Sequence, residues 1–391
     1  MVETSMLPML KVLIPLEEGG ETRVAGSPDT VKSLSKRQLL CTVEKGAGIA
    51  SGFSDESYVS AGAQLVSPKE NSVWAETNLL LTVGPLNNAQ PKLSAGALVV
   101  GQLAPHGNAN LLQLLQQQQL SAISLELLPR ISRAQSMDVL SSQANIAGYK
   151  AVLLAAAALD RYMPMLMTAA GTVQPAKVLV IGAGVAGLQA VATARRLGAV
   201  VKVSDVRAAA REQVESLGAR FIEPPVQGVP GEQGGYAKEA TATFLEAQRQ
   251  GLAEQLGDID MVICTAQVPG RPAPLLLTKE ITELLRPGAV VVDLAVAQGG
   301  NCELSQIGET INHKGVLVIG ADRLPASVPH HASSLYARNV AALLEVLISK
   351  SGEMKLDPED PLLDPCLVSL EGVLRRTDLV PDWSLGEGVK P

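Results

Sequence analysis

Three glycines have the spacing that a dinucleotide-binding turn requires. Gly182, Gly184 and Gly187 follow the apolar run KVLVI, and a helix-forming segment, LQAVATARRLG, comes directly after them. In such a motif the first glycine allows a tight turn, the second lets the backbone approach a pyrophosphate, and the third lets helix and strand pack closely. The helix N-terminus then offers N–H groups and a positive dipole end to the phosphates. The pattern therefore predicts a site for a nicotinamide dinucleotide.

An acidic side chain completes this motif. Asp205 ends the next apolar run, VVKVSD, about 20 residues beyond the turn, where the motif places an acid. Its carboxylate can accept hydrogen bonds from the adenosine ribose hydroxyls and would repel a 2′-phosphate, so NAD(H) is favoured over NADP(H). Arg207 weakens this preference, because an arginine there can attract the phosphate. A Rossmann-type domain that binds no nucleotide is the alternative, since fold does not determine function.

The apolar pattern predicts the elements that position these residues. A series of apolar runs separated by helix-forming segments begins at Lys177, as a doubly wound parallel sheet requires. Another α/β series extends from Lys11 to about Leu103, where Ser27 can cap a helix that Pro28 opens. The strand candidates are residues 177–182, 200–205, 219–224, 260–266, 289–295 and 315–321, and in the other series 11–15, 38–44, 78–83 and 97–103.

Two long helices are expected to join these parts. Residues 136–164 are rich in Ala and Leu, and residues 332–350 return the chain to the first part. With 391 residues, two domains are the natural expectation. We therefore predict an α/β fold of two Rossmann-like lobes, each a doubly wound parallel sheet, with an NAD cleft between them. The first lobe is residues 1–140 plus 332–391, and the NAD(H)-binding Rossmann domain is residues 141–331.

Composition excludes several classes of protein. A net charge of −7 gives no basic face for nucleic acid. Charged residues interrupt the longest apolar runs well short of the roughly 20 residues that a membrane-spanning helix needs. No secretory signal precedes the first strand, so a cytoplasmic location is the default. Four cysteines without the spacing of a zinc site or disulfide framework are expected to be buried thiols: Cys41, Cys264, Cys302 and Cys366.

No metal site is expected, although two places could suggest one. His330 and His331 are neighbours in a predicted helix, so their side chains point about 100° apart and cannot easily share an ion. We expect them in a solvated first turn. Residues 356–376 cluster carboxylates with prolines, and a solvated loop with a short strand is the expected structure.

Eight stretches, spread over nearly the whole chain, resemble one family. They are similar to the soluble NAD(H)-binding domain of the alpha subunit of proton-translocating nicotinamide nucleotide transhydrogenase, which shares its fold with alanine dehydrogenase. The stretches are ETRVAGSPDTVK, KGAG, PRISRAQSMDVLSSQANIAGYKAV, KVLVIGAGVAGLQAVATARRLGAVV, REQVESLGARFIE, GGYAKE, PGRPAPLLLTKE and VVDLAVAQGGNCELS.

These two relatives perform different chemistry. Oxidation of an amine needs proton transfers, and alanine dehydrogenases have a Lys and a His where this chain has Thr82 and Gln102. His106 could replace that His only if the alignment shifted, and Arg23, which matches a pyruvate-binding arginine, also occurs in transhydrogenases. Direct hydride exchange needs no proton donor, only two nicotinamide rings face to face in a dry site. An alanine dehydrogenase-like enzyme and a non-catalytic NAD-binding regulatory protein remain the alternatives.

The resemblance also implies roles for three loops. In RISRAQSMD, Arg130, Gln135 and Asp138 are expected to orient the nicotinamide carboxamide and ribose, although a turn that only caps the following helix is the alternative. In GVPGEQGGYAKE, residues 228–239, Tyr236 resembles the aromatic residue of a loop that closes over nucleotide; a floppy surface insertion is the alternative. In CTAQVPGRPAP, Gln267 replaces a more usual aliphatic residue.

The expected site residues therefore come from these loops and from the glycine motif. The expected catalytic residues are Arg130, Gln135, Asp138, Ser141 and Tyr236. The expected cofactor-binding residues are Arg130, Ile131, Ser132, Gln135, Ser136, Met137, Asp138, Gly182, Gly184, Val185, Ala186, Gly187, Asp205, Val206, Arg207, Gly235 and Gln267.

The resemblance implies a larger assembly. Because the chain ends soon after this domain, we expect a separate NAD(H)-binding subunit of an NAD(P)+ transhydrogenase that is active with partner subunits. Those partners would be a membrane-spanning subunit that conducts protons, an NADP(H)-binding subunit and a second copy of this chain. Hydride would pass between NAD(H) here and NADP(H) on the partner, coupled to proton translocation. The chain would be cytoplasmic and attached through its partners to the inner or a thylakoid-type membrane.

Overall fold

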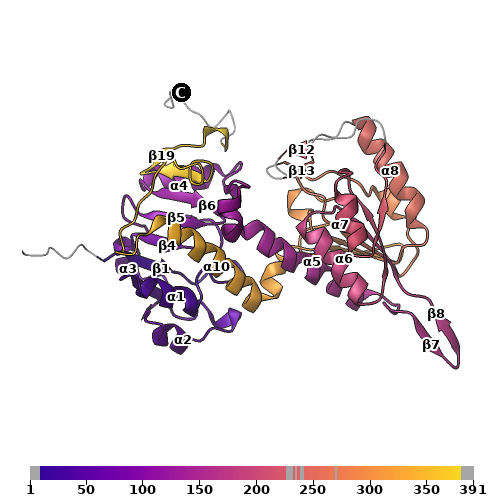
Figure 1. Ribbon diagram of the computed structural model, residues 1–391, viewed down its shortest axis with the longest axis horizontal. Helices are drawn as coiled ribbons and strands as arrows, with labels where there is room; N and C mark the ends of the chain where they lie inside the picture. Colours follow the sequence, from indigo (N-terminus) through magenta and orange to yellow (C-terminus); the bar gives the residue numbers. More distant parts are fainter. Residues whose placement is uncertain (1–8, 226–231, 234–235, 238–241, 269–270, 380–391) are drawn as a thin grey trace, which may run out of the picture. The chain divides into compact units, whose positions relative to one another are not determined.

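The computed structural model describes residues 9–225, 232–233, 236–237, 242–268 and 271–379 (Figure 1). The chain divides into two compact units, residues 1–143 with 328–391 and residues 144–327. The first boundary falls at 143/144, where the sequence suggests 140/141, and the second at 327/328, where it suggests 331/332. Within the described ranges, no helix is long and apolar enough to cross a bilayer.

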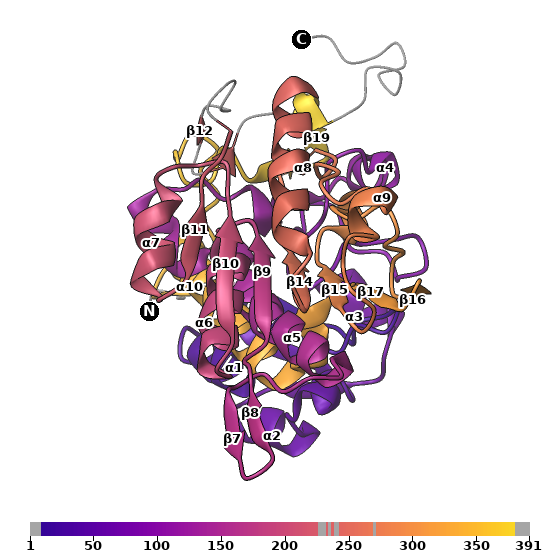
Figure 2. The same cartoon turned by 90° about the vertical axis from the view of Figure 1, so that its right-hand side faces the viewer.

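The second unit is built on a seven-stranded sheet (Figure 2). Its strand order is β11-β10-β9-β14-β15-β17-β16, and every pair is parallel except β16–β17. The strands are β9 (Lys177–Ile181), β10 (Val200–Ser204), β11 (Arg220–Ile222), β14 (Met261–Cys264), β15 (Val290–Asp293), β16 (Thr310–His313) and β17 (Val316–Gly320). All six strands expected here are confirmed. The edge strand β16 and the hairpin of β7 (Leu166–Thr168) and β8 (Gly171–Val173) were not predicted.

Helices cover both faces of this sheet because alternate residues of each strand point to opposite sides. Val178 and Val180 of β9 pack with helices α5, α6 and α7, whereas Leu179 and Ile181 pack with α8. The helices of this unit are α6 (Val185–Arg196), α7 (Ala210–Ser216), α8 (Ala242–Leu256) and α9 (Lys279–Thr282), and α5 (Val139–Ala158) enters it from the first unit.

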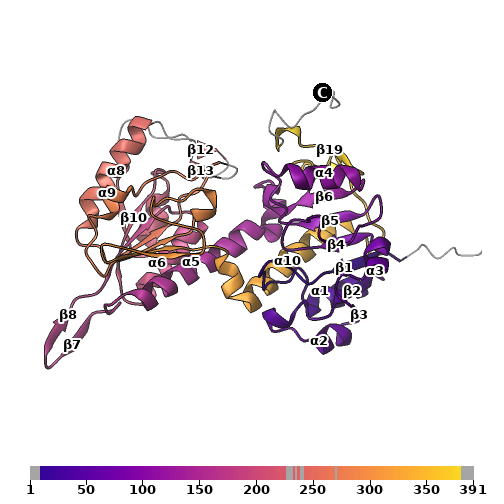
Figure 3. The same ribbon diagram turned by 180° about the vertical axis from the view of Figure 1, so that it is seen from behind.

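The first unit repeats the same strand order (Figure 3). Its parallel strands lie in the order β3-β2-β1-β4-β5-β6, and β18 and β19 extend the sheet antiparallel. These strands are β1 (Lys11–Ile14), β2 (Leu40–Glu44), β3 (Gln64–Val66), β4 (Leu79–Leu81), β5 (Leu98–Gly101), β6 (Ser121–Ser124), β18 (Leu367–Leu370) and β19 (Val373–Leu374). The helices are α1 (Pro28–Ser35), α2 (Asp55–Ser60), α3 (Asn71–Glu76), α4 (Ala109–Gln117) and α10 (Pro329–Leu347).

The structure corrects the expectation for residues 356–376. The short strand is present as β18, and the segment before it is a loop with exposed carboxylates, as expected. The loop is not wholly solvated, however, because Leu362, Leu363 and Cys366 are buried in the main core of the first unit. The apolar side chains decide the structure here, although carboxylates and prolines dominate the composition of the segment. All four cysteines are buried and free, as predicted.

The two long helices are confirmed with different ends. α5 begins at Val139 rather than 136, and α10 begins at Pro329, a residue that suits the first helical position. His330 and His331 are therefore in the first turn and exposed, as expected. Among the residues that the structure describes, no group of three or more His, Cys, Asp or Glu side chains could hold a metal ion.

Candidate functional site

The glycine turn of the second unit begins where β9 ends. Gly182 has φ +98°, in the left-handed region that glycine favours. A Cβ at Gly187 would lie 1.8 Å from the Gly182 carbonyl oxygen, so only glycine permits this packing. At Gly184 nothing lies within 4 Å of a Cβ, and the backbone there is open to a ligand. Each glycine thus has the local geometry that a pyrophosphate-binding turn needs.

Helix α6 starts directly after this turn, at Val185, and Ala186 follows. Gly184 is its N-cap residue and supplies no side-chain acceptor to the first N–H groups. An N-terminus without a side-chain cap suits an anion, because its N–H groups and dipole favour negative charge. The residues therefore fit a dinucleotide phosphate.

Asp205 connects this turn to the end of β10. Its carboxylate accepts a hydrogen bond from the Ala183 N–H at 2.6 Å and is 7% exposed. It also accepts from the Arg207 N–H at 2.8 Å and from Arg207 Nε at 2.9 Å. Val206, between the two, is half-buried. The expected ribose-binding acid is thus fixed beside the turn, and it offsets the positive charge of Arg207.

The loop after β14 approaches the same edge of the sheet. Gln267, whose effect the sequence left open, donates from Nε2 to the Leu294 carbonyl oxygen at 2.8 Å. That bond joins the end of β14 to the end of β15. Gln267 is exposed, so its amide fixes the loop without entering a core.

The segment expected to orient nicotinamide lies in the first unit. Residues Ser132–Met137 form a 3-10 helix in which Ala134 and Met137 are buried. Five residues expected to bind the cofactor here are exposed: Arg130, Ile131, Ser132, Gln135 and Ser136.

Asp138 caps helix α5. Its carboxylate accepts from the Ser141 N–H at 2.9 Å and from Ser141 Oγ at 2.6 Å, the bonds of an N-cap residue. These contacts agree with the alternative in which the turn before α5 only caps that helix. The roles of Arg130, Gln135 and Asp138 toward nicotinamide stay predictions.

The expected closing loop is described only at a few positions. Tyr236 belongs to β13 (Tyr236–Ala237), which pairs antiparallel with β12 (Glu232–Gln233). Gly235 and most of residues 228–239 lie outside the described residues.

The first unit has a buried polar cluster at the corresponding edge of its own sheet. Thr82 is buried, and its hydroxyl donates to Glu17 at 3.1 Å, while the Val83 N–H donates to the same carboxylate at 2.6 Å. Burial raises the pKa of Glu17 to about 7, against the lowering effect of these hydrogen bonds. Tyr336 Oη donates to the Thr82 carbonyl at 2.9 Å and accepts from the Gln102 N–H at 3.1 Å.

Arg23 is also engaged within this unit. Its Nε and Nη2 each lie 2.8 Å from an oxygen of Glu21, and its Nη1 donates to Gln143 Oε1 at 2.9 Å. His106 is exposed after β5. Glu17 and Glu21 were not predicted from the sequence. The signal for Glu17 was an acidic residue close after the end of a buried strand, β1.

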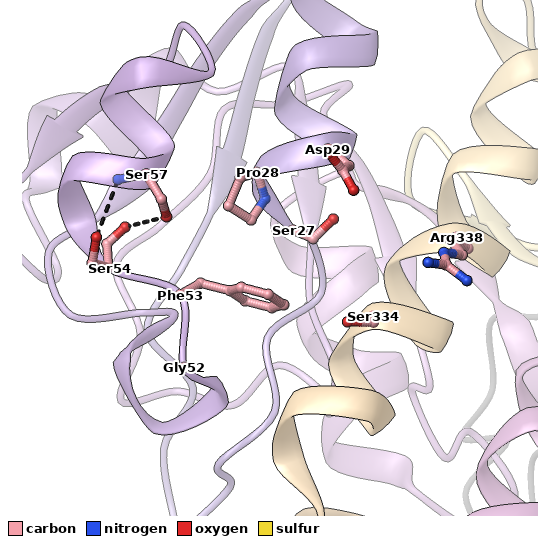
Figure 4. A pocket seen from close by; sticks show the side chains of 9 residues that line it. All are labelled: Ser27, Pro28, Asp29, Gly52, Phe53, Ser54, Ser57, Ser334 and Arg338. Atoms are coloured by element: carbon pink, nitrogen blue, oxygen red, sulfur yellow. Dashed lines mark hydrogen bonds between the residues drawn. The ribbon is translucent and has the colours of Figure 1, made fainter.

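A cavity of about 310 Å³ lies elsewhere in the first unit, beside α1, α2 and α10 (Figure 4). The chain uses most of its hydroxyl groups: Ser57 Oγ donates to the Ser54 carbonyl at 2.6 Å, and Ser334 Oγ to the His330 carbonyl at 2.8 Å. None of the expected site residues lines it, so we assign it no function. Its lining residues are Ser27, Pro28, Asp29, Gly52, Phe53, Ser54, Ser57, Ser334 and Arg338.

Comparison with known proteins identifies the family. Residues 13–147 match the alanine dehydrogenase/PNT N-terminal domain, and residues 151–377 match its C-terminal domain. A Rhodospirillum rubrum protein, named as the first part of NAD(P) transhydrogenase subunit alpha, is 42% identical over 362 residues, 90% of this chain and 94% of that protein. Alanine dehydrogenase of Bacillus subtilis is 28% identical, over 88% of this chain and 86% of its own.

A solved structure agrees with the sequence comparison. The transhydrogenase from Sinorhizobium meliloti superposes with a TM-score of 0.83 at 42% identity, over 93% of this chain and 99% of that one. The two-sheet α/β fold and the resemblance stated from the sequence are both confirmed. The chain belongs to the alanine dehydrogenase/PNT family, and it is more similar to these transhydrogenases than to the alanine dehydrogenase compared with them.

Proposed function

We propose that this chain is the NAD(H)-binding subunit of a proton-translocating nicotinamide nucleotide transhydrogenase. The observation that carries this proposal is the turn from Gly182 to Gly187, with Asp205 fixed beside it. Its open backbone at Gly184 suits a pyrophosphate, and the carboxylate suits the adenosine ribose. Residues 144–327 would then be the nucleotide domain, and residues 1–143 with 328–391 the first lobe.

The chain's own residues would bind, orient and shield the cofactor. The exposed Arg130 and Gln135 would hold the nicotinamide carboxamide, with Asp138 and Ser141 beside them, and Tyr236 would belong to a closing loop. When bound, NAD(H) supplies or accepts a hydride with its electron pair, while NADP(H) on a partner subunit is correspondingly reduced or oxidised. Exclusion of water would keep that hydride from side reactions.

Amino-acid dehydrogenation has weaker support. Thr82 and Gln102 carry no group that titrates near neutral pH, so neither can act as the acid or base that amine oxidation needs. Arg23 is paired with Glu21 and Gln143 and is not presented as an anion anchor. Glu17, which accepts a hydrogen bond from the Thr82 hydroxyl, has a pKa of about 7, so the turnover experiment below also tests it as the acid or base.

The names of the relatives support an assembly of several chains. The Rhodospirillum rubrum relative is named as one portion of a subunit alpha. We therefore propose a membrane-spanning subunit and an NADP(H)-binding subunit as partners, with this chain attached through them to the membrane. A homodimer is also proposed. The hairpin β7–β8 and the residue before it offer exposed apolar side chains for contacts, since Met167 is 74% and Met165 56% exposed.

The first experiment measures NADH binding by fluorescence and then NADH formation from NAD+ and L-alanine. We expect binding without turnover; turnover would contradict the proposal in favour of an amino-acid dehydrogenase. With the partner subunits added, NADPH that carries deuterium at C4 is mixed with NAD+, and the deuterium should appear in the NADH that forms. Its loss to solvent would exclude direct transfer.

A substitution at the ribose position tests the site itself. Asp205→Ala should weaken NADH binding about tenfold, roughly 1.4 kcal/mol, and reduce the discrimination against NADPH. Asp258→Ala is the matched control, because Asp258 is exposed in the same unit and pairs only with lysines in the contacts described. Unchanged affinity of Asp205→Ala for both nucleotides would refute the assignment.

A further inference from the structure

The glycine turn has no polar side chain of its own with which to fix its backbone. Residues 182–184 read Gly-Ala-Gly, and no side chain caps the helix that follows. Its position therefore depends on neighbouring strands. Asp205, after β10, holds the Ala183 N–H on one side. The other side of the turn lies next to β14.

Thr265, the first residue after β14, occupies that other side. Its hydroxyl lies 3.0 Å from the carbonyl oxygens of both Ile181 and Gly182, to which it can donate. Its backbone N–H also donates to the Ile181 carbonyl, at 2.8 Å. A Cβ at Gly182 would lie 2.7 Å from Thr265 Oγ1, and one at Gly187 3.0 Å. This single side chain therefore contacts the first glycine of the turn and occupies the space beside the third.

The residue after Thr265 is held by a buried amide. Asn301 Oδ1 accepts from the Ala266 N–H at 3.0 Å, and Asn301 Nδ2 donates at 2.8 Å to the carbonyls of Ala266 and Pro274. Asn301 is completely buried, so an unpaired polar group there would be costly. Both ends of the loop after β14 are thus fixed by one side chain.

Asn301 is in turn fixed by the end of β15. Asp293 accepts from the Asn301 N–H at 2.8 Å, from the Cys302 N–H at 2.9 Å and from Ser305 Oγ at 2.8 Å. These bonds form a continuous path across the carboxyl ends of three adjacent strands, β15, β14 and β9, and the path ends at the turn.

We infer that Thr265 and Asn301 are positioning residues that hold the glycine turn in its pyrophosphate-binding conformation. The inference rests on the proposed function, because it assumes that the turn binds a dinucleotide. A merely structural role would lower stability without any preference for phosphate-bearing ligands. A positioning role must appear as weaker binding of phosphates.

The test compares NADH, ADP and adenosine binding to Thr265→Val, which keeps the shape of the side chain and removes its hydroxyl. We expect NADH and ADP affinity to fall about fivefold, the effect of one hydrogen bond, and adenosine affinity to stay the same. Thr265→Ser should restore the wild-type values. Asn301→Asp should weaken ADP binding as well, because it replaces the amide donor facing the Ala266 and Pro274 carbonyls with an oxygen.

Thr193→Val is the matched control. Thr193 is a buried threonine of α6 whose hydroxyl donates to the Gln189 carbonyl at 2.8 Å, so its loss should lower stability and leave ligand affinity unchanged. If wild type binds NADH and Thr265→Val binds ADP equally well, or loses adenosine as strongly as ADP, the inference is wrong and the proposed function stands. If wild type binds no NADH, both fail.

Discussion

The two sheets of this protein share one strand order and treat the same position in opposite ways. In each, the order reverses between the first and fourth strands, β1 and β4 or β9 and β14. Ligands of open α/β sheets bind at this point, outside the carboxyl ends of the strands. In the second unit the chain there is the open glycine turn. In the first unit the chain places the carboxylate of Glu17 there, bound to the Val83 N–H at 2.6 Å.

The helices that follow the first strand of each sheet, α1 and α6, also differ in whether their N-termini are closed by the chain or left open. α1 of the first unit is capped by its own side chains, since Ser27 Oγ accepts from the Thr30 N–H at 3.3 Å and Thr30 Oγ1 from the Ser27 N–H. α6 of the second unit has no such cap. A helix N-terminus can satisfy its N–H groups with the chain or with a ligand. The comparison shows that strand order locates a possible site, while local side chains decide whether it is open.

The largest effect is expected from closing the open turn. Gly187→Ala would bring a Cβ to 1.8 Å from the Gly182 carbonyl oxygen, so the turn must move. NADH affinity should fall about 100-fold, roughly 2.8 kcal/mol, and the unfolding temperature should fall with it. Fluorescence titration and thermal unfolding measure the two effects.

Gly184→Ala separates binding from folding. Its φ of −74° suits alanine and nothing lies within 4 Å of the new Cβ, so stability should be unchanged. NADH affinity should fall about tenfold, because the methyl group takes space needed by the pyrophosphate. Gly251→Ala, with similar open space in α8, should leave affinity unchanged. Wild-type affinity in Gly184→Ala would show that the ligand does not approach there.

An effect on stability rather than on binding is expected from removing the carboxylate of Glu17, which lies where the strand order of the first unit reverses. The folded pKa of Glu17, about 7, is above its ordinary value of 4.5. The stability from its bound proton is therefore complete below pH 4.5 and lost as the pH rises through 7. Glu17→Gln should match wild type at about pH 4.5 and exceed its unfolding free energy by roughly 1–3 kcal/mol at about pH 8.

Urea unfolding across this pH range measures the difference. Glu254→Gln, at an exposed position of α8, is the control and should follow wild type at every pH. A difference in unfolding free energy between Glu17→Gln and wild type that stays constant across this range would mean that the pKa of Glu17 is not raised in the folded protein. At neutral pH the first unit would then hold a charged carboxylate, rather than a protonated one, at the position where its strand order reverses.

The sequence predicted those features of the two units that depend on residues adjacent in the chain, namely the strands and the glycine turn. The six strands of the second unit were recognisable because buried parallel strands are continuous apolar runs. The glycine turn was recognisable because its three conformational requirements occur within six residues, 182–187. The edge strand β16 was missed because its burial is mixed, and the core position of Leu362 was hidden by the carboxylates around it.

The contacts that hold the turn were beyond prediction because their partners are distant in sequence. Thr265 is 84 residues from Ile181, and Glu17 is 66 residues from Val83. Nothing in the local pattern marks Thr265 or Asn301 as different from any polar residue after a strand. Only the register of the strands, which places their carboxyl ends side by side, brings these side chains to the turn.

The smallest effect concerns the other segment that we propose binds the cofactor, residues 130–138. Buried hydrogen bonds hold the glycine turn, but on its outer side this segment is tied by an exposed ion pair, Arg133 to Asp360 at 2.9 Å. Arg133→Ala should lower the unfolding free energy by less than about 1 kcal/mol, because water and salt screen such pairs. Urea unfolding with and without high salt measures this, and the effect should vanish in high salt. NADH affinity should stay unchanged, because the buried Ala134 and Met137 keep the segment in place. A large loss of affinity would show instead that the exposed ion pair positions the segment.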